Sequence, residues 1–218
     1  MEWDWAFVLE ILPTLWDGFK ITILATVLGS IVAAVVGLVM ALLRRSPNPW
    51  IGRTSGFLID FIRGTPLLVQ LYFLFYILPG LGLTLSPLTA GVIGLGVHYG
   101  TYAAEVYRGG IDNVPRGQWE AAKACNLTPR QTWINVILPQ AIPPMIPALA
   151  NYLIAMFKET PLLSAITVIE LMNQARSIAN FNYRYVEPMT MVGVFFLVIS
   201  LISVVGLRYL ERRFGRLS

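Results

Sequence analysis

The sequence predicts an all-α protein that crosses a membrane several times. Of its 218 residues, 56% are hydrophobic and only 13% are charged, which excludes a disordered chain and an ordinary water-soluble domain. The apolar residues form long uncharged stretches, and a helix of about 20 such residues crosses the hydrocarbon core of a bilayer. The fold class is therefore a polytopic membrane protein built from helices.

Five membrane-spanning helices are predicted, over residues 19–43, 57–78, 88–111, 140–160 and 188–208. The second and third share one uncharged run, residues 64–104, which is too long for a single span. The turn-forming residues 79–87 divide this run, so each helix continues past its nearest charges. The five spans and their loops make one transmembrane domain, residues 19–218.

Residues 1–18 form a separate N-terminal segment. Its apolar residues Trp5, Val8, Leu12 and Trp16 recur at the spacing of an amphipathic helix. Such a helix, with tryptophans on its apolar face, lies along a membrane surface. We therefore expect an extracytoplasmic, interfacial helix before the first span.

The positions of Lys and Arg predict the orientation in the membrane. Arg44, Arg45 and Arg53 follow the first predicted span, and further basic residues follow the third and fifth, whereas the turn 79–87 contains none. Because cytoplasmic loops are rich in Lys and Arg, the N-terminus is expected outside and the C-terminus in the cytoplasm. Basic loops between apolar stretches also indicate contact with membrane lipid and not with nucleic acid.

The loop between the third and fourth spans, residues 112–139, is too long for a helical hairpin and too apolar for a solvated linker. Its central part is rich in helix formers, places Trp119, Ala122 and Asn126 on one face, and is stopped by Thr128 and the proline after it. The sequence therefore predicts a short helix along the inner surface. Spacing alone leaves open whether this helix docks a cytosolic partner or only bridges two spans.

Small residues also recur at four-residue spacing, namely Gly29, Ala33 and Gly37 in the first span and Gly96 and Gly100 in the third. This spacing allows two helices to approach closely. Close core packing is the expected role.

Catalytic and metal chemistry have little support in the sequence. One cysteine, Cys125, and one histidine, His98, exclude an intrachain disulfide and the usual Cys/His metal cages. An intramembrane enzyme needs a nucleophile beside a base, and Ser164 or Ser200 with His98 on another span is a weak case. A stand-alone channel is the other alternative function, but a channel would need no helix that docks a cytosolic partner.

Polar residues in or near the spans fall into two groups. Arg63, Gln70, Glu105 and Arg108 are interpreted as structural, as snorkelling side chains or partners across helices. The second group interrupts an apolar region at the outer end of the fourth span, and it comprises Lys158, Glu159 and Thr160. Opposite charges there could line the pathway of a zwitterionic solute, or they could only mark the end of the span.

Three separated blocks of the 112–139 loop carry a resemblance to a known family. Glu120-Ala121-Ala122, then Asn126, then Val136-Ile137-Leu138-Pro139 resemble the EAA-x3-G-x9-I-x-LP loop of ABC importer permeases, with Asn126 in place of glycine and Val136 in place of isoleucine. Asparagine tolerates the left-handed conformation that the glycine would adopt. The run from Arg63 to Gln70 resembles the RGTPLLVQ block of polar amino-acid permeases. The similarity extends over about residues 10–214.

The resemblance implies a type I ABC importer permease in the cytoplasmic (inner) membrane of a prokaryote. Its expected partners are a second permease subunit, identical or paralogous, two ATP-binding cassette subunits and an extracytoplasmic solute-binding protein. Glu120, Ala121, Ala122 and Asn126 would belong to the helix that couples the permease to the ATPase. The solute would be a polar amino acid or a related zwitterion moved by alternating access. Residues 183–189 resemble the ectoine-type branch, whose solutes are compatible solutes.

ATP chemistry is expected outside this chain. The sequence lacks the G-x-x-x-x-G-K-[ST] loop that cradles phosphates, so ATP and Mg²⁺ are assigned to the partner ATPase. The chain itself is expected to be a transport component without a cofactor of its own, and not an enzyme.

Overall fold

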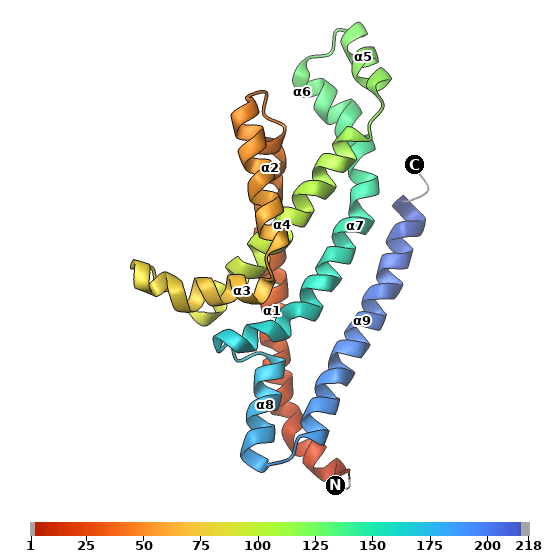
Figure 1. Ribbon diagram of the computed structural model, residues 1–218. Helices are drawn as coiled ribbons and strands as arrows, with labels where there is room; N and C mark the ends of the chain where they lie inside the picture. The colour runs from red at the N-terminus through yellow and green to blue at the C-terminus, as the bar shows by residue number, and fades with distance from the viewer. Residues whose placement is uncertain (1–2, 215–218) are drawn as a thin grey trace.

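The computed structural model describes residues 3–214, and all regular structure in that range is helical, which confirms the predicted fold class (Figure 1). The longer helices are α1 (Trp5–Arg44), α2 (Pro49–Gly64), α4 (Pro87–Asp112), α7 (Leu138–Glu159), α8 (Leu171–Asn182) and α9 (Val186–Phe214). The shorter ones are α3 (Leu67–Tyr72), α5 (Arg116–Ala124) and α6 (Pro129–Gln131), with irregular helical turns η1 (Phe73–Ile77), η2 (Leu78–Leu81), η3 (Thr132–Ile137) and η4 (Thr160–Ile166).

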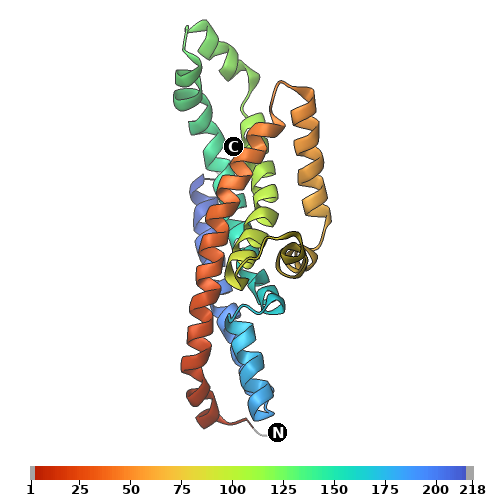
Figure 2. The ribbon, with the colours of Figure 1, turned by 90° about the vertical axis from the view of Figure 1, so that its left-hand side faces the viewer.

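Within the described residues, three helical stretches are long and apolar enough to cross a membrane, or four if the bent pair of α2 and the following helices counts as one span. The predicted count of five is therefore not reached by this criterion. Of the five predicted spans, the one that does not meet this criterion is 88–111, which forms α4. This helix carries several glycines and tyrosines, which make it less apolar. It packs against α1, α2 and α7 near the centre of the molecule (Figure 2), so protein covers much of its surface.

Residues 3–18 do not form a separate helix, which corrects the prediction for this part of the N-terminal segment, and Met1 and Glu2 lie outside the described residues. Asp4 caps α1 by accepting hydrogen bonds from the backbone amides of Ala6 and Phe7, and the helix then runs through Pro13 without a break. At 1.5 Å per residue, its 40 residues extend about 60 Å, twice the thickness of the hydrocarbon core. The first turns pack on α8 and α9 through an apolar cluster that includes Leu15 and Leu171. This tertiary packing continues the helix where sequence reasoning placed a boundary.

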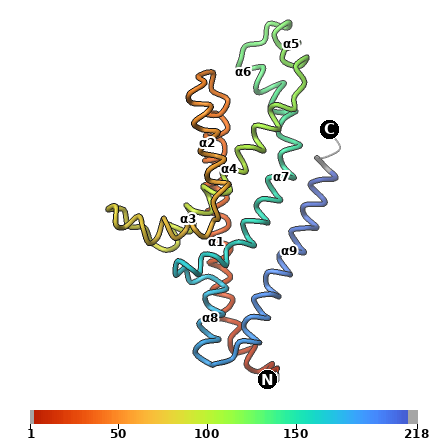
Figure 3. Tube along the Cα trace, viewed as in Figure 1, coloured from red at the N-terminus to blue at the C-terminus, as the bar shows by residue number. Residues whose placement is uncertain are grey.

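The predicted helix 57–78 is also wrong, because the chain bends by 101° between α2 and α3. A residue before proline disfavours the helical conformation, and Thr65 is extended, with φ −104° and ψ 138°. The side-chain amide of Gln70 donates to the backbone oxygens of Ile62 and Thr65 at 2.7 and 3.1 Å, which satisfies the broken backbone. Beyond the bend, α3, η1 and η2 form an arm that projects sideways from the bundle (Figure 3).

The glycines predicted to allow close helix approach do so between α1 and α4. A Cβ atom added to Gly37 would lie 2.7 Å from Cβ of Ala103, and one added to Gly96 would lie 2.4 Å from Cγ1 of Val32. Neither position has room for a larger side chain. The two helices are therefore in backbone-level contact over several turns.

A buried carboxylate joins α8 to α1. Glu170 is fully buried and caps α8, accepting hydrogen bonds from the backbone amides of Met172 and Asn173 at 2.9 and 2.8 Å. The backbone amide of Leu171 donates to Oγ1 of Thr22 at 3.2 Å. Burial raises the pKa of Glu170 to about 7, against the opposing effect of its two backbone hydrogen bonds. The sequence analysis did not single out Glu170.

Candidate functional site: a docking helix and a central cavity

The helix α5 lies in the loop that sequence reasoning selected, although it ends three residues earlier than the predicted stop at Leu127. Asn126 follows it with φ 54°, and the backbone amide of Leu127 donates to the oxygen of Ala122 at 3.1 Å. This is a left-handed helix end of the kind that glycine usually provides. The structure thus confirms that Asn126 adopts the turn that the family's glycine would adopt.

The two faces of α5 differ sharply in burial. Ala122 is 3% exposed, and Trp119 packs edge-on against Trp133 with 5.3 Å between ring centroids. Glu120 and Ala121 lie on the exposed side. Glu120 forms no ion pair with any residue that the structure describes. Its carboxylate is therefore available to a partner.

A network of ion pairs ties the ends of α1 and α4 together beside this loop. Glu105 accepts from Arg44 at 2.6 Å and from Arg108 at 2.9 Å, and Arg108 also contacts Asp112 at 3.0 Å. Arg45 completes the network through Asp112. Glu105 is therefore an interhelical partner, through Arg44 of α1, whereas Arg108 pairs only within α4, with Glu105 and Asp112.

Arg63 does not belong to this network. It lies at the end of α2, next to the bend, and its guanidinium carbon sits 4.8 Å from the ring centroid of Tyr102. Arg63 therefore contacts a residue of another helix, α4, which is one of the two roles expected from the sequence.

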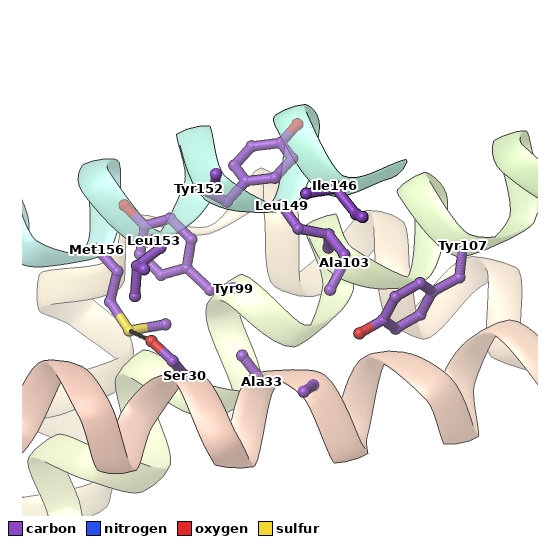
Figure 4. Close-up of a pocket in the computed structure, with 12 residues that line it drawn as sticks. Ser30, Ala33, Tyr99, Ala103, Tyr107, Ile146, Leu149, Tyr152, Leu153 and Met156 are labelled. Carbon is purple, nitrogen blue, oxygen red and sulfur yellow. Dashed lines mark hydrogen bonds between the residues drawn. The ribbon is translucent and has the colours of Figure 1, made fainter. Parts of the chain in front are cut away.

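A cavity of about 350 Å³ lies between α1, α4 and α7. Small residues of α1, including Ser30 and Ala33, form one wall, and Tyr99 and Tyr107 of α4 stand at its two ends (Figure 4). Ser30 donates a weak hydrogen bond to the sulfur of Met156, with 3.5 Å between the atoms. Sequence reasoning missed this cavity, although two tyrosines eight positions apart on one helix, Tyr99 and Tyr107, could have signalled it.

Tyr99 and Tyr152 line the cavity, and Tyr99 has further aromatic and polar neighbours that lie behind the lining residues. The rings of Tyr99, Tyr102 and Tyr152 pack with centroids 5.2 to 6.5 Å apart, and His98 stacks beside the first two. His98 is 8% exposed and its Nδ1 has no hydrogen-bond partner. Glu159 interacts with His98 and Tyr99, yet its Oε2 is buried without a partner.

The three predicted pathway residues have different surroundings. Lys158 is exposed, whereas Glu159 is half-buried and turned toward the tyrosines. Thr160 is fully buried and donates to the backbone oxygen of Phe157 at 2.7 Å. Lys158 and Glu159 form no ion pair with each other or with another described residue. Among the described residues, the contacts of Glu159 are therefore with uncharged rings of α4 and not with a cation.

The sequence profile of a known family, described as the binding-protein-dependent transport system inner membrane component, matches residues 33–216. The chain belongs to this family. It is 44% identical over 198 residues to a probable amino-acid ABC transporter permease protein, y4tG, of Sinorhizobium fredii, covering 91% of this chain and 86% of that one. It is 37% identical over 216 residues to the glutamine transport system permease protein GlnP of Escherichia coli, covering 98% of each.

A solved structure agrees with this placement. A chain from the crystal structure of an amino acid ABC transporter with histidines matches with a TM-score of 0.90 and 35% identity, over 98% of this chain and all of that one. The protein is thus a multi-pass permease component of an ABC importer and not an enzyme, with ATP hydrolysis in a separate subunit.

Proposed function

We propose that this permease imports a polar amino acid or a closely related zwitterion, such as a compatible solute. The observation that carries the proposal is the half-buried carboxylate of Glu159, which contacts Tyr99 in the lining of the central cavity and whose Oε2 has no hydrogen-bond partner. Buried polar atoms without partners are costly, so a polar ligand that supplies the missing hydrogen bonds is favoured there. The glutamine permease and the histidine-containing structure among the relatives support the same solute class.

The cavity suits a small zwitterion. Its volume of about 350 Å³ lies at the lower end of the range for small-molecule sites. Glu159 would receive the ammonium group, and the faces of Tyr99 and Tyr152 would support it by cation–π attraction. Lys158, exposed on this chain, would meet the carboxylate from the pathway between two permease subunits. Alternating access would then expose the solute to one side at a time.

The proposed assembly contains a second permease subunit, identical or paralogous, and two ATP-binding cassette subunits that bind ATP and Mg²⁺. The exposed face of α5, with Glu120 and Ala121, would dock the ATPase. An extracytoplasmic binding protein would deliver the solute from the opposite side.

Reconstituted transport tests the proposal. The permease is placed in vesicles with the ATPase and the binding protein encoded beside it, and uptake of labelled glutamine, histidine, arginine and ectoine is compared. We expect ATP-dependent uptake of at least one of these solutes. Uptake that continues equally without ATP would contradict the proposal and indicate a channel.

The proposed orientation has the N-terminus outside and the 112–139 loop in the cytoplasm. Because Cys125 is exposed in that loop, the labelling experiment needs a Cys125→Ser background. An impermeant thiol reagent added to intact cells should then label Thr84→Cys, in the turn before α4, and leave Gln118→Cys unlabelled. Labelling of Gln118→Cys with Thr84→Cys protected would reverse the orientation.

A further inference from the structure

A second cavity, of about 690 Å³, lies between the α1–α2 turn and the docking loop, away from the central cavity. One side of it consists of Val39, Leu42 and Leu43, in the last turns of α1. The opposite side consists of Trp119 and Trp133, the pair that supports α5. The cavity therefore touches both the end of a membrane span and the element assigned to ATPase docking.

The apolar wall of this cavity belongs to the end of a helix that is long and apolar enough to cross a membrane. Val39, Leu42 and Leu43 belong to the uncharged first span, and they are 49%, 57% and 41% exposed. A soluble protein docked on α5 would have to enter the hydrocarbon region to cover them. An acyl chain of the surrounding bilayer would cover them without such an entry.

The other end of the cavity is polar and positively charged. Arg45 and Ser46 line it, and residues 44–59 contain three arginines and no acidic residue. The first turn of α2, which carries the positive end of the helix dipole, begins at Pro49 beside this turn. Arg45 contacts Asp112, but a guanidinium has five N–H donors and can bind a phosphate as well.

We propose that this cavity binds one anionic phospholipid from the leaflet that adjoins the docking loop. Its phosphate would lie against Arg45 and Ser46, and its chains would lie along Leu42 and Leu43. The two tryptophans suit the boundary between headgroups and chains, where amphipathic rings are favoured. Basic pockets between helices at the cytoplasmic surface are typical sites for anionic headgroups. The bound lipid would fill the space between α1 and the two tryptophans, Trp119 and Trp133, that support α5.

The test measures lipid retention by native mass spectrometry on the whole transporter complex, extracted into detergent with equal amounts of phosphatidylglycerol and phosphatidylcholine. We expect phosphatidylglycerol to be retained in preference. Ser46→Glu places a negative charge at the polar end and should weaken phosphatidylglycerol binding about five-fold, the scale of one charge near a membrane surface. Thr54→Glu makes a similar change at an exposed site of α2 that does not line the cavity, and should have no effect.

A steric variant separates lipid binding from headgroup binding and from protein docking. Leu43→Trp narrows the apolar end and should reduce retention of the whole lipid, while glycerol phosphate, which has no chains, should not compete for the site. Equal effects of Ser46→Glu and Thr54→Glu would overturn the proposal. It would also be overturned if Leu43→Trp released the ATPase subunits with lipid retention unchanged, since the cavity would then be a protein-docking surface.

Discussion

Glu120→Lys should uncouple the ATPase from transport while leaving the permease in the membrane in normal amounts. Glu120 is exposed on α5 and has no ion-pair partner among the residues described, so its removal breaks no contact within the fold. A charge-assisted hydrogen bond to a partner contributes about 1.5–3 kcal/mol, and reversing the charge adds repulsion. We expect binding-protein-stimulated ATP hydrolysis to fall at least about ten-fold. The measurement is ATPase activity in reconstituted vesicles with and without binding protein.

The control for this variant is Glu10→Lys, the same charge change at an exposed position of α1 far along the chain from α5. It should leave stimulated hydrolysis unchanged. If Glu120→Lys instead lowered the amount of permease in the membrane, with coupling per molecule intact, Glu120 would be a structural residue and the docking assignment would fail.

The docking loop was predictable because its determinants are local. A run of helix formers, an asparagine able to adopt φ 54° and a Thr-Pro pair act within a few residues of one another. Even here one detail was wrong, since Thr128 does not stop α5, which ends at Ala124, but caps the helix that follows. Its side chain and that of Gln131 form a reciprocal capping box that starts α6.

The helix boundaries that failed depend on contacts between distant residues. Hydropathy places a boundary near Lys20, but packing of α1 against Leu171 and its neighbours in α8 carries the helix through this region. Pro66 was a visible signal that the chain bends after α2. The angle of the bend, however, depends on the side-chain amide of Gln70, which donates hydrogen bonds to the backbone oxygens of Ile62 and Thr65. The hydrophobic periodicity of a single sequence carries no information about contacts between residues far apart in the chain.

The central cavity could be predicted only in part. Glu159 stood out because a charge between apolar runs is expensive in a membrane. That its Oε2 would be buried beside His98 and Tyr99 of another helix required the packing of α4 on α7. The four-residue spacing of Gly29, Ala33 and Gly37 predicted how closely α1 approaches α4, but not the cavity that the small side chains leave near Ser30.

Glu159→Gln should abolish most uptake while leaving the transporter assembled. The substitution keeps the size of the side chain but removes the negative charge that would hold the ammonium group of the solute. Since a hydrogen bond to a charged group contributes about 1.5–3 kcal/mol, uptake should fall at least about ten-fold. Lys158→Met should have a comparable effect at the carboxylate end, with basal ATP hydrolysis retained in both variants. The measurement is binding-protein-dependent uptake at several solute concentrations.

The two variants test different parts of the proposed pathway, because Glu159 is half-buried against the tyrosines and Lys158 is exposed. Their neighbour Thr160 is fully buried and bonded to the backbone of Phe157, so Thr160→Val should lower stability without a selective loss of solute affinity. Wild-type uptake in both charge variants would show that this region only anchors the outer end of α7. Loss of uptake in Glu159→Gln alone would move the carboxylate site elsewhere and leave the cavity as the site of the ammonium group, because the negative charge of Glu159, which has no ion-pair partner among the described residues, would still be required.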